Sequence, residues 1–252
     1  MAKDLLVVSD IKKSYGDTKA VRGVSFSVPE GEIFGILGPN GAGKTTTLEM
    51  IETLRSIDGG SITIDGIDVS KDPQAIKYMI GVQSQSPAFM DKVKLTEQLE
   101  QIASTYGERV NTRKLLEEVG LLDKASSFVE SLSGGQKQRF SIVASLVHRP
   151  KIFFMDEPTT GLDPQARRNL WDLITQISGR GVTIILTTHY MEEAETLCDR
   201  VAIMDNGEII ALDKPAHLVK ELLGRGFKKE RKVEQANLED VFIDLTGKGL
   251  KD

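Results

Sequence analysis

Four residues near the start of the chain have the types and spacing that suit the binding of a polyphosphate. Gly38, Gly43, Lys44 and Thr45 fill the pattern G-x-x-x-x-G-K-[ST] within residues 33–48, IFGILGPNGAGKTTTL. Glycines allow successive backbone N–H groups to curl around phosphate oxygens at the positive end of a helix dipole. The lysine supplies a charge for the β- and γ-phosphates, and the threonine hydroxyl is a ligand for Mg²⁺. The sequence therefore predicts a P-loop between a strand and a helix.

Two acids end a second apolar run, residues 151–157, KIFFMDE. The run has the form of a buried parallel strand, and α/β proteins place their chemistry at the carboxyl ends of such strands. Asp156 would hold Mg²⁺, directly or through water, and Glu157 would orient and deprotonate an attacking water. Acids at a strand end can also be solvated termini, but the P-loop upstream favours the catalytic interpretation.

Two ring side chains are further candidates for the same site. His189 follows the apolar run 182–186, VTIIL, and could hydrogen-bond a γ-phosphate. A lone histidine is more often structural, but a position beyond a core strand favours a role in the site. Tyr15 could stack on a purine base through its π-face, or it could simply end a strand.

Residues 131–141, SLSGGQKQRFS, open a predicted helix. Ser133 and Gln136 have the spacing of a capping box, which explains both residues without a ligand. Gly134 and Gly135 in the first turn nevertheless cost helix stability, about 1 kcal/mol each relative to alanine. A phosphate that approaches the helix N-terminus is the simplest reason for this bare backbone.

The elements around these residues indicate an α/β fold. Two apolar runs within residues 5–30, separated by KKSYGDTKAVRG, and a hairpin at residues 61–69 predict a small antiparallel sheet. About fifty residues of helix, ending at Ser133, then interrupt the alternation of strands and helices. A later helix begins with Asp163 as its N-cap and Pro164 as its first residue.

The last elements that the sequence predicts are a hairpin over residues 201–211 and a short helix after it. We therefore predict a main domain and a short C-terminal extension. Their ranges are 1–215 for the domain, about 87–148 for a helical subdomain inserted in it, and 216–252 for the extension.

Composition sets broad limits on the class of protein. The chain has 252 residues, of which 40% are hydrophobic and 27% charged, as is ordinary for a globular protein. Its longest apolar runs are far shorter than the roughly 20 residues that span a bilayer, and no signal-peptide core is present. We expect a chain that is neither secreted nor membrane-spanning. The formal charge of -5 argues against nonspecific binding of nucleic acid, and a single cysteine, Cys198, excludes an internal disulfide.

Taken together, the motifs are similar to those of the ATP-binding subunits of ABC transporters. GPNGAGKT resembles the Walker A motif, LSGGQ from Leu132 the family signature, FFMDE the Walker B motif, GLD the D-loop, and His189 the switch histidine. The combination, in this order, covers nearly the whole chain. THYMEEAE from Thr188 and LEDVF from Leu238 resemble the branch that serves ABC-2 type exporters of drugs, lipids or polysaccharides.

The resemblance implies a P-loop NTPase (RecA-like) core with an N-terminal antiparallel β-subdomain and an inserted α-helical subdomain, and it implies ATP and Mg²⁺ as cofactors. The residues implied to bind ATP are Tyr15, Gly38, Pro39, Asn40, Gly41, Ala42, Gly43, Lys44, Thr45, Thr46, Ser133, Gly135, Gln136 and His189. The implied Mg²⁺ ligands are Thr45, Gln85 and Asp156, and the implied catalytic residues are Lys44, Glu157 and His189. Because the family often has proline before the Q-loop glutamine and this chain has serine, Gln83 is a minor alternative to Gln85.

The resemblance also implies two kinds of partner. A second nucleotide-binding subunit, identical or homologous, would pair head to tail around two ATP molecules, each held by the P-loop of one subunit and the signature of the other. A separate integral-membrane permease would form the transport pathway and place the chain at the cytoplasmic face of the membrane. Phe89 and Met90 are candidate contacts with that permease, or else packing residues of the helical subdomain.

A soluble ABC ATPase without a transport role is the main alternative. DNA-repair members carry long coiled coils between the Walker motifs, and translation members join two domains in one chain. Neither feature occurs in this sequence. An iron–sulfur assembly ATPase stays open, whereas a P-loop kinase or GTPase would leave LSGGQ and His189 unexplained.

Overall fold

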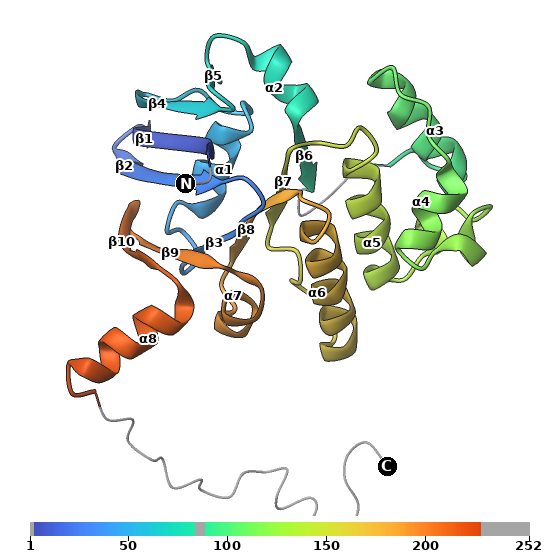
Figure 1. The fold of residues 1–252 in the computed structure, drawn as a ribbon. Coiled ribbons are helices and arrows are strands. Elements are labelled where there is room, and N and C mark those ends of the chain that lie inside the picture. Colours follow the sequence, from blue (N-terminus) through green and yellow to red (C-terminus); the bar gives the residue numbers. More distant parts are fainter. Residues whose placement is uncertain (1–2, 84–88, 228–252) are drawn as a thin grey trace, which may run out of the picture. The chain divides into compact units, whose positions relative to one another are not determined.

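The computed structural model describes residues 3–83 and 89–227 (Figure 1). Its strands are β1 (Asp4–Tyr15), β2 (Thr18–Pro29), β3 (Ile33–Leu37), β4 (Gly59–Ile64), β5 (Ile67–Asp68), β6 (Ile80–Gln83), β7 (Ile152–Asp156), β8 (Thr183–Thr188), β9 (Arg200–Asp205) and β10 (Glu208–Asp213). Its helices are α1 (Lys44–Ile51), α2 (Pro73–Met79), α3 (Leu95–Thr105), α4 (Thr112–Glu118), the 3-10 helices η1 (Leu122–Lys124) and η2 (Val129–Ser131), α5 (Gly134–Ser145), α6 (Pro164–Ser178), α7 (Met191–Leu197) and α8 (Pro215–Gly224).

The strands form two sheets. A four-stranded antiparallel sheet has the order β2-β1-β4-β5, and a six-stranded sheet has the order β10-β9-β3-β8-β7-β6. In the larger sheet β3 pairs in parallel with both β8 and β9, and β7 pairs in parallel with β6 and β8. This arrangement confirms the predicted α/β core with an antiparallel β-subdomain.

The register of the larger sheet brings the ends of its strands to one edge. Leu37 pairs with Thr188, and Asp156 pairs with Thr187. Because parallel strands end at the same edge of a sheet, the segments that leave β3, β7 and β8 lie side by side there. Those segments are the ones that carry the P-loop, Glu157 and the residues after Thr188.

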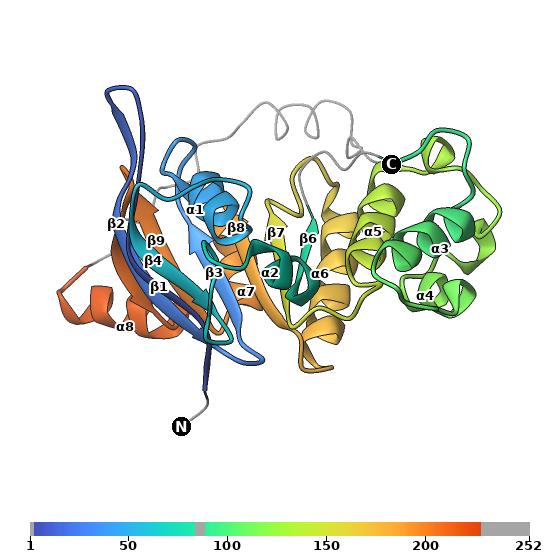
Figure 2. The same ribbon diagram turned by 90° about the horizontal axis from the view of Figure 1, so that it is seen from above.

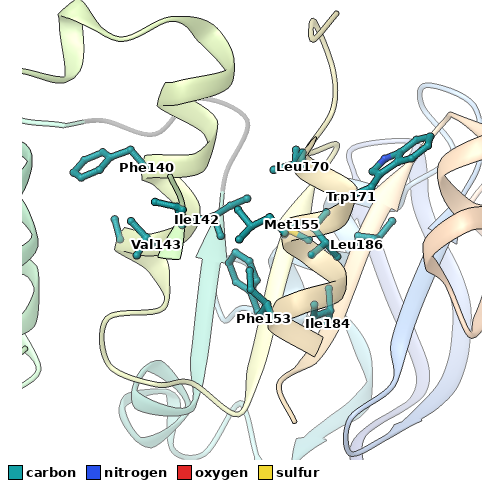
Figure 3. Close-up of a cluster of buried hydrophobic side chains, with 14 of the residues drawn as sticks. Phe140, Ile142, Val143, Phe153, Met155, Leu170, Trp171, Ile184 and Leu186 are labelled. Atoms are coloured by element: carbon teal, nitrogen blue, oxygen red, sulfur yellow. The ribbon is translucent and has the colours of Figure 1, made fainter. Parts of the chain in front are cut away.

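Strand β7 is buried on both faces, and its side chains alternate between two hydrophobic cores. Phe153 and Met155 point into the core formed with α5 and α6 (Figure 3), whereas Ile152 and Phe154 pack in the core that includes α1 and the antiparallel sheet. Each large apolar side chain contributes about 1.5–3 kcal/mol when it is fully buried. The two cores therefore fix the position of Asp156 at the end of the strand.

The helical region lies between β6 and β7 in the sequence and contains α3, α4, η1, η2 and α5. Both ribbon views place α3 and α4 beyond α5, away from the sheets (Figures 1 and 2). This placement fits an inserted helical subdomain, whose proposed limits at about residues 87 and 148 remain predictions.

The chain divides into a unit that ends at Leu218 and a unit that begins at Val219, and α8 crosses this boundary. The domain limit proposed at residues 215 and 216 remains a prediction. Within the described ranges, no helix combines the length and the apolar character that crossing a bilayer requires.

The first two strands are longer than the sequence predicts. β1 and β2 form one hairpin in which Tyr15 pairs with Thr18, so most of the expected connection KKSYGDTKAVRG is strand. Its exposed lysines and glycines hide the alternation that identifies a strand. The sequence also gave no prediction of α2, which begins with Asp72 as its N-cap.

Candidate nucleotide-binding site

The P-loop lies between β3 and α1 and packs closely against neighbouring backbone. A Cβ atom at Gly38 would lie 2.2 Å from the carbonyl oxygen of Met204, and one at Gly43 would lie 2.5 Å from that of Ala20. Gly41 and Gly43 have φ angles of 82° and 100°, a region that side chains disfavour. The loop therefore requires glycine at position 38 for space, at position 41 for backbone conformation, and at position 43 for both.

Lys44 is the first residue of α1 and is buried, with 5% of its surface exposed. Its Nζ donates to the carbonyl oxygens of Gly38 (2.8 Å) and Pro39 (3.1 Å), and it lies 3.5 Å from Oε1 of Glu157. A buried ammonium group needs such partners, because an unpaired charge is costly away from water. The P-loop lysine and the acid that follows β7 are thus in direct electrostatic contact.

Asp156 and Glu157 lie next to the P-loop and are both held by Thr187 of β8. The Thr45 hydroxyl lies 3.2 Å from Oδ2 of Asp156, and the Thr187 hydroxyl hydrogen-bonds Oδ1 of the same residue. Glu157 has a left-handed backbone, with φ of 49°, and its N–H donates to the carbonyl oxygen and the Oγ1 of Thr187, each at 3.1 Å. A non-glycine residue in this region is held there by its surroundings.

His189 follows β8 and lies on the other side of Glu157. Its Nδ1 is 3.2 Å from Oε2 of Glu157, and the hydroxyl of Thr160 is also 3.2 Å from that oxygen. The imidazole packs on Tyr190, with ring centroids 4.1 Å apart, and the Arg167 guanidinium lies 4.5 Å from the Tyr190 ring. The histidine is therefore placed by contacts on two sides.

A cavity of about 510 Å³ opens over the P-loop. Its lining residues are Tyr15, Ala20, Asn40, Gly41, Gly43, Lys44, Thr45, Thr46 and Glu157. Tyr15 is the last residue of β1 and is 41% exposed, with the Arg55 guanidinium 5.5 Å from its ring. The tyrosine thus ends a strand and also lines the cavity, so the two interpretations of its role are compatible.

The signature residues lie at the start of α5 and form the predicted capping box. Gln136 N–H donates to Oγ of Ser133 at 3.4 Å, and Ser133 N–H donates to Oε1 of Gln136 at 3.0 Å. Of the three signature residues predicted to bind ATP, Ser133, Gly135 and Gln136, none lines the cavity over the P-loop in the described part of the chain.

The contacts among the described residues do not explain why the signature has glycine at positions 134 and 135. A Cβ atom at Gly134 would meet none of their heavy atoms within 4 Å, and one at Gly135 would lie 3.4 Å from Cβ of Ala166, an ordinary contact. Neither glycine has a positive φ angle. What requires glycine here therefore lies outside the contacts of the described chain.

The Q-loop and permease predictions concern the end of β6 and the segment that follows it. Gln85 lies outside the described residues, and the alternative, Gln83, is the buried last residue of β6. Phe89 packs on Phe140 of α5, with ring centroids 4.9 Å apart, whereas Met90 is 52% exposed. The packing interpretation therefore fits Phe89, and Met90 is free to contact a partner.

The oxygens of Thr45 and Asp156 fit a Mg²⁺ ion that also binds phosphate. Mg²⁺ is commonly held by one or two carboxylates together with water and substrate phosphates. Within the described ranges, no group of three or more His, Cys, Asp or Glu side chains is arranged to hold a metal by itself. This donor set suits a metal that arrives with a nucleotide.

Three residues near the site were not singled out from the sequence. Thr187 and Thr160 position the two acids, and only their places, near the carboxyl end of β8 and shortly after β7, could have pointed to them. Glu52, at the end of α1, is buried with 6% exposure, and burial raises its pKa to about 8, with further upward contributions from Asp156 and Glu49. A glutamate at the end of a helix of mixed polarity carries no sequence signal for such a shift.

Comparison with known proteins assigns the family. Residues 21–160 match the sequence family described as ABC transporter. The linearmycin resistance ATP-binding protein LnrL of Bacillus subtilis (strain 168) is 42% identical over 253 residues, which cover 98% of this chain and 76% of that protein. Nod factor export ATP-binding protein I of Rhizobium etli is 43% identical over 223 residues, covering 86% of this chain and 70% of the relative.

The fold agrees with that assignment. A solved structure of an ATP-binding subunit of an ABC transporter matches with a TM-score of 0.78 at 30% identity, covering 96% of this chain and 99% of that one. A second, an ATP-binding cassette solved in its ADP conformation, matches with a TM-score of 0.78 at 26% identity, over 88% of this chain and 96% of that chain. The chain belongs to the ABC transporter family, as one of its ATP-binding, ATP-hydrolysing subunits.

Proposed function

We propose that this chain hydrolyses ATP to power export by a separate integral-membrane subunit, as the ABC-2 type resemblance and the names of its relatives suggest. The observation that carries the proposal is the cluster at the carboxyl edge of the larger sheet. There Glu157 lies 3.5 Å from the Lys44 ammonium and 3.2 Å from the His189 imidazole. One acid is thus placed between a phosphate-binding cation and a candidate γ-phosphate ligand.

In this proposal the residues of the P-loop hold the triphosphate. Backbone N–H groups from Gly43 to Thr46 face phosphate oxygens at the start of α1, and Lys44 exchanges its contacts with loop carbonyls for the β- and γ-phosphates. Tyr15 stacks on the adenine ring. Thr45 and Asp156, with Gln85, would hold Mg²⁺, which supplies neutralising charge to the phosphates when it is bound.

Glu157 is proposed to orient a water and accept its proton as the water attacks the γ-phosphate. A general base acts at hydrogen-bond distance from the proton that it takes. The fixed backbone of Glu157 and its contact with Thr160 support a defined position for the carboxylate. His189 would hydrogen-bond the γ-phosphate and, through its contact with Glu157, keep the two groups in one geometry.

A second nucleotide-binding subunit is proposed to complete each site. Ser133, Gly135 and Gln136 lie away from the cavity over the P-loop, and no described contact requires glycine at positions 134 and 135. Both observations are accounted for if the start of α5 meets the γ-phosphate of ATP bound to another subunit. Release of phosphate would then loosen the pair, which couples hydrolysis to movement.

The remaining partner is a permease, and the chain would act at the cytoplasmic face of the membrane through it. Exposed Met90 is a candidate contact. The names of the relatives lend no support to the alternative of an iron–sulfur assembly ATPase. Copurification of the full chain with an integral-membrane protein would support the transporter role, and copurification only with soluble assembly proteins would contradict it.

The base assignment is tested with Glu157→Gln. We expect ATP turnover to fall by about 10²-fold or more because the amide accepts no proton, while ATP binding is retained. In size-exclusion chromatography with ATP and Mg²⁺ the variant should elute as a stable dimer. Glu192→Gln, at an exposed acid of α7, is the matched control and should keep wild-type turnover. Persistent turnover in Glu157→Gln would contradict the assignment.

A further inference from the structure

A second cavity, of about 670 Å³, lies at the edge of the larger sheet opposite to the nucleotide site. Two of its lining residues show this position: Lys151 directly precedes β7, and Val182 directly precedes β8. These are the amino ends of strands whose carboxyl ends carry Asp156 and Thr188. The volume is within the range of about 300–1,000 Å³ that is usual for small-molecule sites.

The floor of this cavity is apolar and comes from three helices, α4, α5 and α6, and from residues that adjoin them. Val143 and Val147, from α5 and the turn after it, and Leu173 and Ile177 of α6 are buried core residues that line it. Val110, Leu115, Leu146 and Val182 also line it and are only partly buried. Figure 1 shows α5 between α4 and α6, so the floor spans the border between the helical region and the core of the protein. Such a surface favours an apolar ligand body, because burial removes it from water.

The rim of the same cavity is cationic. It carries Arg109, Lys114, Arg149, Lys151 and Arg180, against the two carboxylates of Glu30 and Glu118. Lys151 is paired with Asp65 at 2.5 Å, and Arg180 with Glu118 at 2.6 Å. The other three cations form no ion pair with any described residue. In a chain whose formal net charge is -5, this excess of positive charge marks a preference for an anion.

Arg149 adds an independent observation. It has a φ angle of 55°, and its N–H donates to the carbonyl oxygen of Leu146 at 3.0 Å, so it closes the turn that follows α5. Glycine or asparagine is the usual residue for a left-handed position after a helix. Here an arginine occupies the disfavoured conformation and brings its exposed side chain to the rim of the cavity.

From the apolar floor and the unpaired cationic rim together, we infer that this cavity binds an amphiphilic anion, a molecule with an alkyl body and a carboxylate or similar head group. The alkyl chain lies on the valine, leucine and isoleucine floor, and the head group pairs with Arg109, Lys114 and Arg149. A nucleotide would leave the floor unused, and an alkyl cation would be repelled at the rim. The site is separate from the nucleotide site and does not depend on the function proposed for it.

The test is isothermal titration of the full chain with decanoate, below the concentration at which it forms micelles. Decyltrimethylammonium has the same alkyl chain with the opposite charge, and acetate has the same head group without the chain. We expect decanoate to bind once per chain and both other probes to bind at least 10-fold more weakly. Equal binding of the cation, or no binding of decanoate, would overturn the inference.

Variants locate the site. The double variant Arg109→Gln/Lys114→Gln should weaken the binding of decanoate at least 10-fold. The control, Lys92→Gln/Arg113→Gln, removes the same charge from exposed residues outside the cavity and should leave the affinity for decanoate unchanged. Val110→Phe narrows the floor without changing charge, and it should also abolish binding, with thermal unfolding showing that the fold is kept. An equal loss in both double variants would mean a nonspecific charge effect and would contradict the assignment, as would unchanged binding in Val110→Phe.

Discussion

Thr187 holds the two acids on which the proposed chemistry depends. Its hydroxyl hydrogen-bonds Asp156, and both its hydroxyl and its carbonyl oxygen accept from the N–H of Glu157, whose backbone is left-handed. A residue in that conformation needs surrounding contacts to stay there. The position of Glu157, the proposed base, is therefore set by a residue of a neighbouring strand.

Thr187→Val removes the hydroxyl and keeps the shape of the side chain. We expect ATP turnover to fall by about 10-fold or more, because Glu157 and Asp156 lose a fixed partner. The matched control is Thr175→Val in α6, whose hydroxyl contacts only its own helix, at the carbonyl oxygen of Trp171. Turnover measured at saturating ATP separates the effect from weaker binding, and unchanged turnover in Thr187→Val would contradict the positioning role.

Glu52 makes stability depend on pH in a predictable direction. Its folded pKa, raised by burial to about 8 from the ordinary 4.5, means that the folded chain keeps a proton that the unfolded chain loses. This contribution to the free energy of unfolding is therefore present below about pH 4.5 and is lost as pH rises through 8.

Glu52→Gln stays neutral at every pH and should remove this loss. In urea unfolding with EDTA present, the free energy of unfolding of the variant, relative to that of the wild type, should rise by more than about 1 kcal/mol between pH 5 and pH 8.5. Glu100→Gln, at an exposed acid of α3, is the control. Parallel pH profiles for the wild type and Glu52→Gln would show that Glu52 is ionised in the folded chain.

At the scale of elements, the start of α5 is a place where a substitution should change ATP turnover without lowering the stability of the fold. Its capping box provides hydrogen-bond acceptors for the backbone N–H groups of Ser133 and Gln136. The two glycines in the first turn have no close neighbour among the described residues that excludes a Cβ atom. Within the isolated chain, alanine at these positions should be as good as glycine or better, since glycine costs a helix about 1 kcal/mol.

Gly134→Ala/Gly135→Ala should thus keep or raise the urea midpoint while lowering ATP turnover at least 10-fold. The added methyl groups would obstruct the approach of a γ-phosphate from the paired subunit. Gly224→Ala, at the end of α8, has equally open surroundings and should leave turnover unchanged. If the double variant hydrolyses ATP at the wild-type rate, the bare backbone has another cause.

The elements that the sequence predicts correctly are those whose signals are local. The P-loop pattern, the Ser133–Gln136 capping box and the Asp163 N-cap all depend on neighbours within a few residues, and the structure contains each of them. The full length of β1 and β2 was not predicted, because their outer halves are stabilised by pairing with each other and show no apolar alternation.

Long-range contacts explain what else the sequence could not supply. Nothing local indicates that β3 lies between β8 and β9, or that Thr187 meets both acids. Tyr15 reaches the cavity over the P-loop only because the β1–β2 hairpin extends beyond its predicted end. The cationic rim and the apolar floor of the opposite cavity likewise come together from α4, α5, α6 and the segments that adjoin them.

At the scale of the whole molecule, the two edges of the larger sheet carry different sets of residues. The carboxyl edge carries the P-loop, Glu157 and His189, while the signature residues lie outside that cavity at the start of α5. In the proposed function, one chain alone would therefore carry two half-sites. A pair arranged head to tail would combine the P-loop of each subunit with the signature of the other.

This central claim is tested most directly by measuring ATP turnover in mixtures of two inactive variants of the purified chain. Lys44→Ala removes the P-loop charge, and Ser133→Arg blocks the signature, so each variant alone should be nearly inactive. In an equal mixture, random pairing gives half mixed dimers, each with one intact site, and turnover should recover to roughly a quarter of the wild-type value. A chain that carries both substitutions, mixed with either single variant, forms no intact site in any pairing and is the control. Recovery in the first mixture is the predicted result, and a mixture no more active than its two components would contradict the account.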